Sequence, residues 1–145
     1  MNIHSPSEHV KTAAGFLLAI TAAVTNGASV DTQGFTRAKV VFDSQPSGAS
    51  TTSTCQVQTA PDNGSGAPGT WTSVGTNLVA TTGGTVGVQV EDIQLDGPTI
   101  LGNRWLRLVH TGVGASAGGV AVGHIELFNP FAYPVAQANT VGAVI

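Results

Sequence analysis

Charged side chains are scarce in this chain of 145 residues. Asp, Glu, Lys and Arg together make up 9% of it, against about 25% in an average soluble domain. A disordered chain combines high charge with few apolar residues, whereas 41% of these residues are hydrophobic, so we expect one folded domain. Because charge keeps protein surfaces apart in solution, the shortage also favours a protein that lives in a stable assembly.

Clusters of basic residues are missing as well. The five Lys and Arg residues are scattered and the formal net charge is −3, which argues against a nucleic-acid partner because phosphate binding needs gathered positive charge. The apolar run "AAGFLLAITAAV" (Ala13–Val24) is too short to span a bilayer. Glu8 beside Lys11 also departs from the basic start of a secretory signal. We therefore expect a buried strand here and no membrane partner.

Metal-binding patterns are not found either. The single Cys55 excludes an internal disulfide framework and a multi-cysteine zinc site; it alternates with Val57, so we expect it in the core. The histidines have no pairing at i, i+2 or i, i+4 that is typical of a metal site, and we expect them at the surface or an interface. They are His4, His9, His110 and His124. The acidic stretch "EDIQLD" supplies Glu91, Asp92 and Asp96. Without a third ligating segment a solvated strand end is favoured over calcium, although the alternative stays open.

Two short motifs match catalytic patterns but lack the structure around them. "GASAG" (Gly114–Gly118) fits the G-x-S-x-G of hydrolase nucleophiles, which works only at a strand-to-helix turn. "GVGASA" (Gly112–Ala117) fits a loose dinucleotide fingerprint, which also needs a following helix. Both lie between two expected strands, so Ser116 is expected in a hairpin loop. We expect no catalytic residue, no metal, no cofactor and no enzymatic activity.

Alternation of apolar and polar residues is present along nearly the whole chain, and it predicts strands. Gly-rich breakers such as "PDNGSGAPG" and "TGVGASAGG" separate them. The expected strands are Gly15–Thr25, Thr36–Asp43, Ser50–Ala60, Thr70–Val74, Asn77–Thr81, Thr85–Leu95, Arg104–Thr111 and Gly119–Phe128. No segment has a convincing helical pattern. The fold class is therefore all-β: an antiparallel two-sheet β-sandwich, jelly-roll-like, with about eight strands.

The strand "RWLRLVH" carries the first candidate interface residues. Strand alternation turns Leu106 and Leu108 toward the core and Trp105 and Arg107 outward. An outward Trp–Arg pair is typical of interface anchors. Trp105 lying beneath a loop of its own chain is the alternative, and the sequence leaves both open.

The two ends of the chain look like extended arms around a central domain. We expect an N-terminal arm over residues 1–13, the β-sandwich over 14–128 and a C-terminal arm over 129–145. The last of these, "NPFAYPVAQANTVGAVI", carries no charge, so we expect another protein chain to cover it. Its prolines remove ladder donors and favour an extended path. The candidate anchors in and beside this arm are Phe128, Pro130, Phe131 and Tyr133.

The order of these pieces resembles the capsid decoration (cement), or auxiliary head, proteins of tailed bacteriophages. The resemblance rests on "D-x-x-G-F" before the second strand, on a "V-Q-x-(A/S)…G-T-W-T-x-V" hairpin and on a "G-N-(K/R)-(Y/W)-(L/V)-R" strand. The matching residues are Asp31, Gly34, Phe35, Val57, Gln58, Gly69, Trp71, Val74, Gly102, Asn103, Arg104, Trp105 and Arg107. Similarity extends over roughly Leu18 to Pro130, and the family offers no catalytic residue to match.

The resemblance implies a non-enzymatic virion structural protein on the outer surface of a phage capsid. Such a protein binds the shell of major capsid protein and stabilises it, often as a homotrimer. Two alternatives remain from the sequence. The same fold serves at the head–tail junction or in the tail, and a carbohydrate-binding module would stack a sugar on Trp105.

Overall fold

The computed structural model describes residues 10–84, 87–97 and 100–130. All regular structure in these residues is β-strand, as the sequence predicts. The strands are β1 (Val10–Ala19), β2 (Val24–Asn26), β3 (Val30–Asp31), β4 (Phe35–Ser47), β5 (Thr52–Ala60), β6 (Thr72–Thr81), β7 (Gly87–Gln94), β8 (Trp105–Val113) and β9 (Gly118–Pro130).

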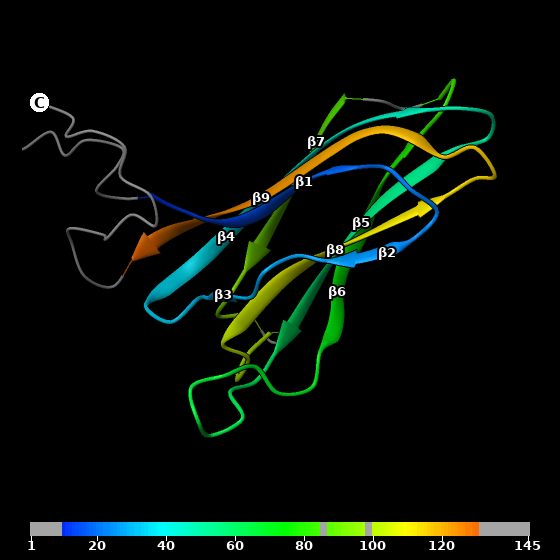
Figure 1. The fold of residues 1–145 in the computed structure, drawn as a ribbon. Helices are drawn as coiled ribbons and strands as arrows, with labels where there is room; N and C mark the ends of the chain where they lie inside the picture. Colours follow the sequence, from blue (N-terminus) through cyan, green and yellow to red (C-terminus); the bar gives the residue numbers. More distant parts are fainter. Residues whose placement is uncertain (1–9, 85–86, 98–99, 131–145) are drawn as a thin grey trace, which may run out of the picture.

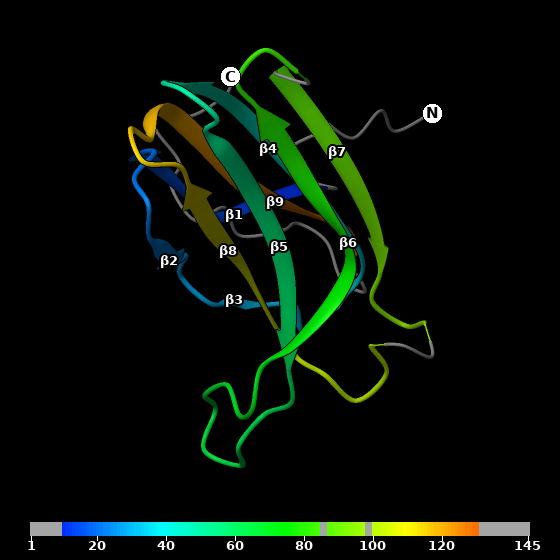
Figure 2. The same ribbon diagram turned by 90° about the vertical axis from the view of Figure 1, so that its right-hand side faces the viewer.

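The strands form two antiparallel sheets (Figures 1 and 2). Sheet A has the order β1-β9-β4-β7, and sheet B has the order β2-β8-β5-β6. β3 also pairs with β8, directly beyond the part of β8 that β2 occupies. If β2 and β3 count as one interrupted strand, the strand orders of the two sheets are those of an eight-stranded jelly roll. The predicted two-sheet, jelly-roll-like sandwich is confirmed.

Two strand boundaries differ from the sequence-based expectation. The expected strand Gly15–Thr25 is divided between β1 in sheet A and β2 in sheet B, because the chain crosses between the sheets just after the buried Ile20. The two segments expected on either side of Gly75 are one strand, β6. Gly75 adopts a φ of 70° and the register against β5 shifts there, so the glycine forms a bulge rather than a turn.

The sheet also extends further toward both ends of the chain than expected. β1 begins at Val10, which pairs with Phe128, so residues 10–13 form strand rather than arm. β9 continues to Pro130, which pairs with Phe35. A proline removes only its own donor, and at the last residue of a strand this does not interrupt the ladder. The candidate anchors Phe131 and Tyr133 lie outside the described residues.

The core lies between the two sheets and follows the alternation read from the sequence. The predicted core residues Leu106 and Leu108 are at most 1% exposed. Cys55 is also fully buried, as expected, and burial raises the pKa of its thiol to about 12. The other side chains that fill the centre are Val40, Phe42, Val57, Ile125 and Leu127.

A polar chain of three side chains crosses this core. The Ser44 Oγ of β4 donates a hydrogen bond to the Ser53 Oγ of β5 at 2.7 Å, and the Ser53 Oγ lies 2.9 Å from the His110 Nε2 of β8. All three residues are at most 1% exposed. The expectation that His110 lies at the surface or an interface is therefore wrong, because it shares the inward face of β8 with Leu106 and Leu108.

This network predicts a pH-dependent stability. Burial lowers the pKa of His110 below its ordinary value of 6.5, so the folded state favours the neutral ring. That stability is present above pH ~6.5 and is lost as pH falls toward the folded-state pKa, by up to ~1.4 kcal/mol per pH unit. We expect urea unfolding between pH 7.5 and 5 to show this loss in the native chain and in His124→Gln, a half-exposed control. In His110→Gln the additional loss should disappear; equal pH slopes in all three proteins would contradict the assignment.

Candidate functional site

The outer face of sheet B carries the expected pair Trp105 and Arg107 on adjacent outward positions of β8. In the register with β5, Arg107 lies opposite Gln58 and Trp105 lies opposite Ala60. Both side chains are half-buried. The predicted outward orientation of this pair is confirmed.

Arg107 joins three segments on this face. Its Nε and Nη2 donate to the Gln58 Oε1 at 2.9 and 2.7 Å. Its guanidinium carbon lies 4.4 Å from the centre of the Trp71 ring, within the range of a cation–π contact. Desolvation lowers the pKa of Arg107, although a guanidinium remains protonated in proteins. Trp71 directly precedes β6, so Arg107 of β8 reaches across β5 to contact it.

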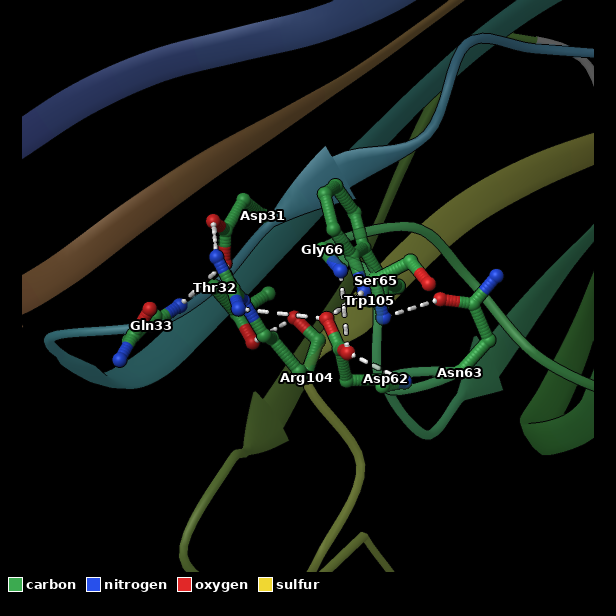
Figure 3. A network of polar contacts seen from close by, with 10 residues as sticks. Asp31, Thr32, Gln33, Asp62, Asn63, Ser65, Gly66, Arg104 and Trp105 are labelled. Atoms are coloured by element: carbon green, nitrogen blue, oxygen red, sulfur yellow. Dashed lines mark hydrogen bonds and ion pairs between the residues drawn. The ribbon is translucent and has the colours of Figure 1, made fainter.

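Arg104 joins three segments at the adjacent end of the sandwich (Figure 3). Its Nε and Nη2 donate to the two carboxylate oxygens of Asp31 at 2.9 and 2.6 Å. Its Nη1 donates to the Asp62 Oδ2 at 3.2 Å. The guanidinium therefore connects the end of β3, the β5–β6 loop and the residue that precedes β8. We call this arrangement the Arg104 clamp, consisting of Asp31, Asp62 and Arg104.

The two carboxylates of the Arg104 clamp also accept hydrogen bonds from the loops that follow them. The Asp31 Oδ1 accepts one from the Gln33 amide at 3.0 Å. The Asp62 Oδ1 accepts hydrogen bonds from the amides of Gly64 and Gly66, at 2.7 and 3.2 Å. The hydrogen bond from Arg104 is the main cause of the lowered pKa of Asp31. For Asp62 the main cause is the bond from the Gly64 amide. Both side chains are therefore held as carboxylates.

Trp105 extends from the Arg104 clamp onto the face of sheet B. The Arg104 guanidinium carbon lies 5.2 Å from the centre of the indole ring, and the indole Nε1 donates a long hydrogen bond of 3.4 Å to the Asp62 Oδ2. Trp105 thus contacts the β5–β6 loop of its own chain, in agreement with the alternative interpretation, and still keeps part of its surface in solvent. Its role as an interface anchor stays a prediction.

The candidate anchor Phe128 lies on the opposite side of the molecule. Phe128 pairs with Arg37 on β4 and lies on the outer face of sheet A. The Lys39 ammonium lies 5.3 Å from the centre of its ring. These residues and Asp92 line a shallow pocket of about 300 Å³. Pro130 ends the same strand. The anchors that fall within the described residues are therefore not gathered into one site.

Sequence reasoning missed the Arg104 clamp as a unit. It named Asp31 and Arg104 only as residues that carry the family resemblance, and it did not connect them with Asp62. The separations of 73 and 42 residues between these partners exceed any local pattern. The available signal was the turn sequence "PDNG", because Asp before Asn-Gly commonly accepts backbone hydrogen bonds within its own turn.

The remaining candidates that lie within the described residues are not gathered into one group. Glu91 and Asp92 are consecutive in β7 and face opposite sides of sheet A; Glu91 accepts a 2.9 Å hydrogen bond from the Thr76 amide. Ser116 is exposed in the loop between β8 and β9, as expected. No cluster of three or more His, Cys, Asp or Glu side chains suited to a metal is found in residues 10–84, 87–97 and 100–130. Nor does this part of the chain contain a helix long and apolar enough to cross a membrane.

Comparison with known proteins gives one distant structural match. No protein-family model matches the chain, and no curated protein matches it. The crystal structure of the SPBc2 prophage-derived protein YomS is similar over 79% of this chain and 93% of that one, with a TM-score of 0.42 and 11% identity. This similarity is too low to support a conclusion about function. The family resemblance seen in the sequence therefore remains a prediction.

The Arg104 clamp generates a prediction about loop order. Arg104→Lys keeps the positive charge but cannot offer the planar fork that binds both Asp31 oxygens. We expect several-fold faster hydrogen exchange at the Gln33, Gly64 and Gly66 amides, with the core amides of β5 and β8 unchanged. Arg37→Lys, at an exposed position on sheet A, is the matched control. Unchanged loop protection in Arg104→Lys would show that the clamp does not order these loops.

Proposed function

We propose that this chain is a non-enzymatic virion structural protein that decorates and stabilises a phage capsid. It binds the shell of major capsid protein from the outer surface and acts as a homotrimer. The supporting observation is that side chains which carry the family resemblance contact one another in the fold. Although distant in sequence, they form three contacts: Asp31 with Arg104, Gln58 with Arg107, and Trp71 with Arg107.

The roles of these residues are structural, which agrees with a family that has no catalytic motif. Gly34 and Gly102 adopt φ values of 90° and 91°, where side chains are strained, so they serve turns. The one Ser–His pair at hydrogen-bond distance in the described part of the chain, Ser53 and His110, is buried in the core. A substrate cannot reach it in this conformation, so the pair supports a structural role rather than hydrolysis.

Attachment would use the anchors on both outer faces. Burying an aromatic side chain such as Trp105 or Phe128 contributes roughly 1.5–3 kcal/mol before the cost of ordering is subtracted. A few such anchors give a modest affinity for each copy. Repetition over a trimer and a symmetric shell raises the total through avidity, which stabilises a capsid without any chemical step.

The test uses particles that lack the protein. Adding the purified full chain should saturate the capsid surface at hundreds of copies per particle and raise the temperature at which the genome is released. Mass measurement and a nuclease-protection heat challenge give the two readouts. A single ring of subunits at one vertex would instead support a head–tail junction role. Absence of any particle binding would contradict both virion functions.

Trp105 provides a second, local test. Its accessibility is measured by acrylamide quenching in a Trp71→Phe background, so that one indole reports. If Trp105 contacts the capsid, quenching should fall several-fold when the protein is bound to particles. Equal quenching in both states would remove Trp105 from the interface. Binding on a glycan array that Trp105→Ala abolishes would favour the carbohydrate-binding alternative.

A further inference from the structure

The outer face of sheet A carries an exposed apolar surface that extends over all four strands. We call it the valine patch; its members are Leu17, Val41, Val88, Val90, Val120 and Val122. Five of them are between 37% and 76% exposed, and Val41 is half-buried. Leu17 lies opposite Val122 and Val41 lies opposite Val90. Between these two pairs, Asp43 lies opposite Val122 and His124 lies opposite Val41.

Such a surface is unusual for the solvent side of a sandwich, where outward residues are normally polar. The outer face of sheet B is more polar. The outward residues of β5 are Thr52, Thr54, Gln56 and Gln58, although Val24, Val79 and Val113 are also exposed on this sheet. A contiguous apolar patch on a soluble domain marks an interaction surface. The difference between the two faces therefore indicates that sheet A has an occupant.

Asp43 adds a chemical requirement for this occupant. It lies within the patch, opposite Val122 on β9 and Val88 on β7. Its Oδ1 is buried and accepts no hydrogen bond from the part of the chain that the structure describes. Asp43 as a whole is half-buried, so an occupant of the patch would cover the rest of its carboxylate as well. Such an occupant has to bring an N–H or O–H donor for this carboxylate in addition to apolar side chains.

The C-terminal segment 131–145 of this protein has that chemistry. It contains no charged residue, it offers Val135, Val141, Val144 and Ile145, and it has amide donors in Gln137 and Asn139. At about 3.3 Å per residue its extended length reaches roughly 50 Å. The stretch of β9 from Val122 to Pro130 measures only about 26 Å on the same scale, so the segment is long enough to lie over the whole patch.

The direction of β9 selects a neighbouring copy as the source of the segment. Val120 and Val122 lie near the start of β9, and β9 ends at Pro130, at the other end. Pro130 and Pro134 favour an extended backbone, so we expect the segment to point away from the valine patch of its own chain. A second copy placed beyond this end would present its patch to the segment.

We propose that segment 131–145 of one copy docks on the valine patch of the next copy. Its aliphatic side chains cover the patch, and an amide N–H donates to Asp43. This rests on the homotrimer of the proposed function and specifies its contact: each copy gives one segment and receives one, in a closed ring. The interface is then heterologous, and the number of contacts equals the number of subunits.

The test compares oligomeric state in four proteins by light scattering after gel filtration. The full chain should be a trimer, and a chain ending at Pro130 should be a monomer. Val88→Thr/Val122→Thr changes two exposed patch residues with little effect on volume, and it should weaken trimer association roughly tenfold or more. The matched control, Val24→Thr/Val113→Thr, changes exposed valines on sheet B and should assemble like the native chain.

A peptide of residues 131–145 completes the experiment. It should bind the chain that ends at Pro130, and binding should weaken when that chain also carries the patch substitutions. A truncated chain that remains trimeric, or a patch variant that assembles normally, would overturn the proposal, as would a full chain that is monomeric with its own patch protected. A trimer that fails to bind particles would instead contradict the proposed function while leaving this contact intact.

Discussion

One guanidinium shared by two carboxylates sets the geometry of an entire end of this molecule. Arg104 contacts Asp31 and Asp62, and through them it fixes the end of β3, the β5–β6 loop and the entry to β8. The charges are partly exposed, so these ion pairs contribute little to the free energy of folding. Their main effect is to position the three segments relative to one another. Position matters here because the Arg104 guanidinium and the Asp62 carboxylate both contact Trp105, the largest side chain available to an interface on this face.

The two outer faces divide the surface into unlike halves. Sheet B presents amides, hydroxyls and two arginine–tryptophan contacts, in which the polar groups are already paired within the chain. Sheet A presents the valine patch and the Asp43 Oδ1, which has no hydrogen-bond partner among the residues that the structure describes. The first arrangement gives a preformed surface that loses little entropy on binding. The second is unfavourable in water and calls for a partner, so different contacts of one assembly suit the two faces.

The sequence predicted those features that repeat every second residue. Alternation was enough for the fold class, for the core positions Leu106 and Leu108 and for the outward pair Trp105 and Arg107. It also placed His110 inward, but the general preference of histidine for surfaces led to the wrong expectation. The Gly75 bulge and the crossing after Ile20 were not predicted from the sequence, because each depends on the local backbone conformation. The Arg104 clamp was not predicted because only the jelly-roll path of the chain brings its partners together.

The shortage of charged residues limits the ways in which this chain can recognise a partner. A chain with 9% charged residues has little long-range electrostatic attraction with which to choose partners. Its contacts must therefore depend on buried apolar area and on the few polar atoms within it, such as the Asp43 Oδ1. Apolar burial is not directional. The alignment of one copy on the next therefore has to be set by those polar atoms and by the position of Pro130 at the end of β9. A shell of many identical copies suits this chemistry, because symmetry repeats a weak contact until the whole is stable.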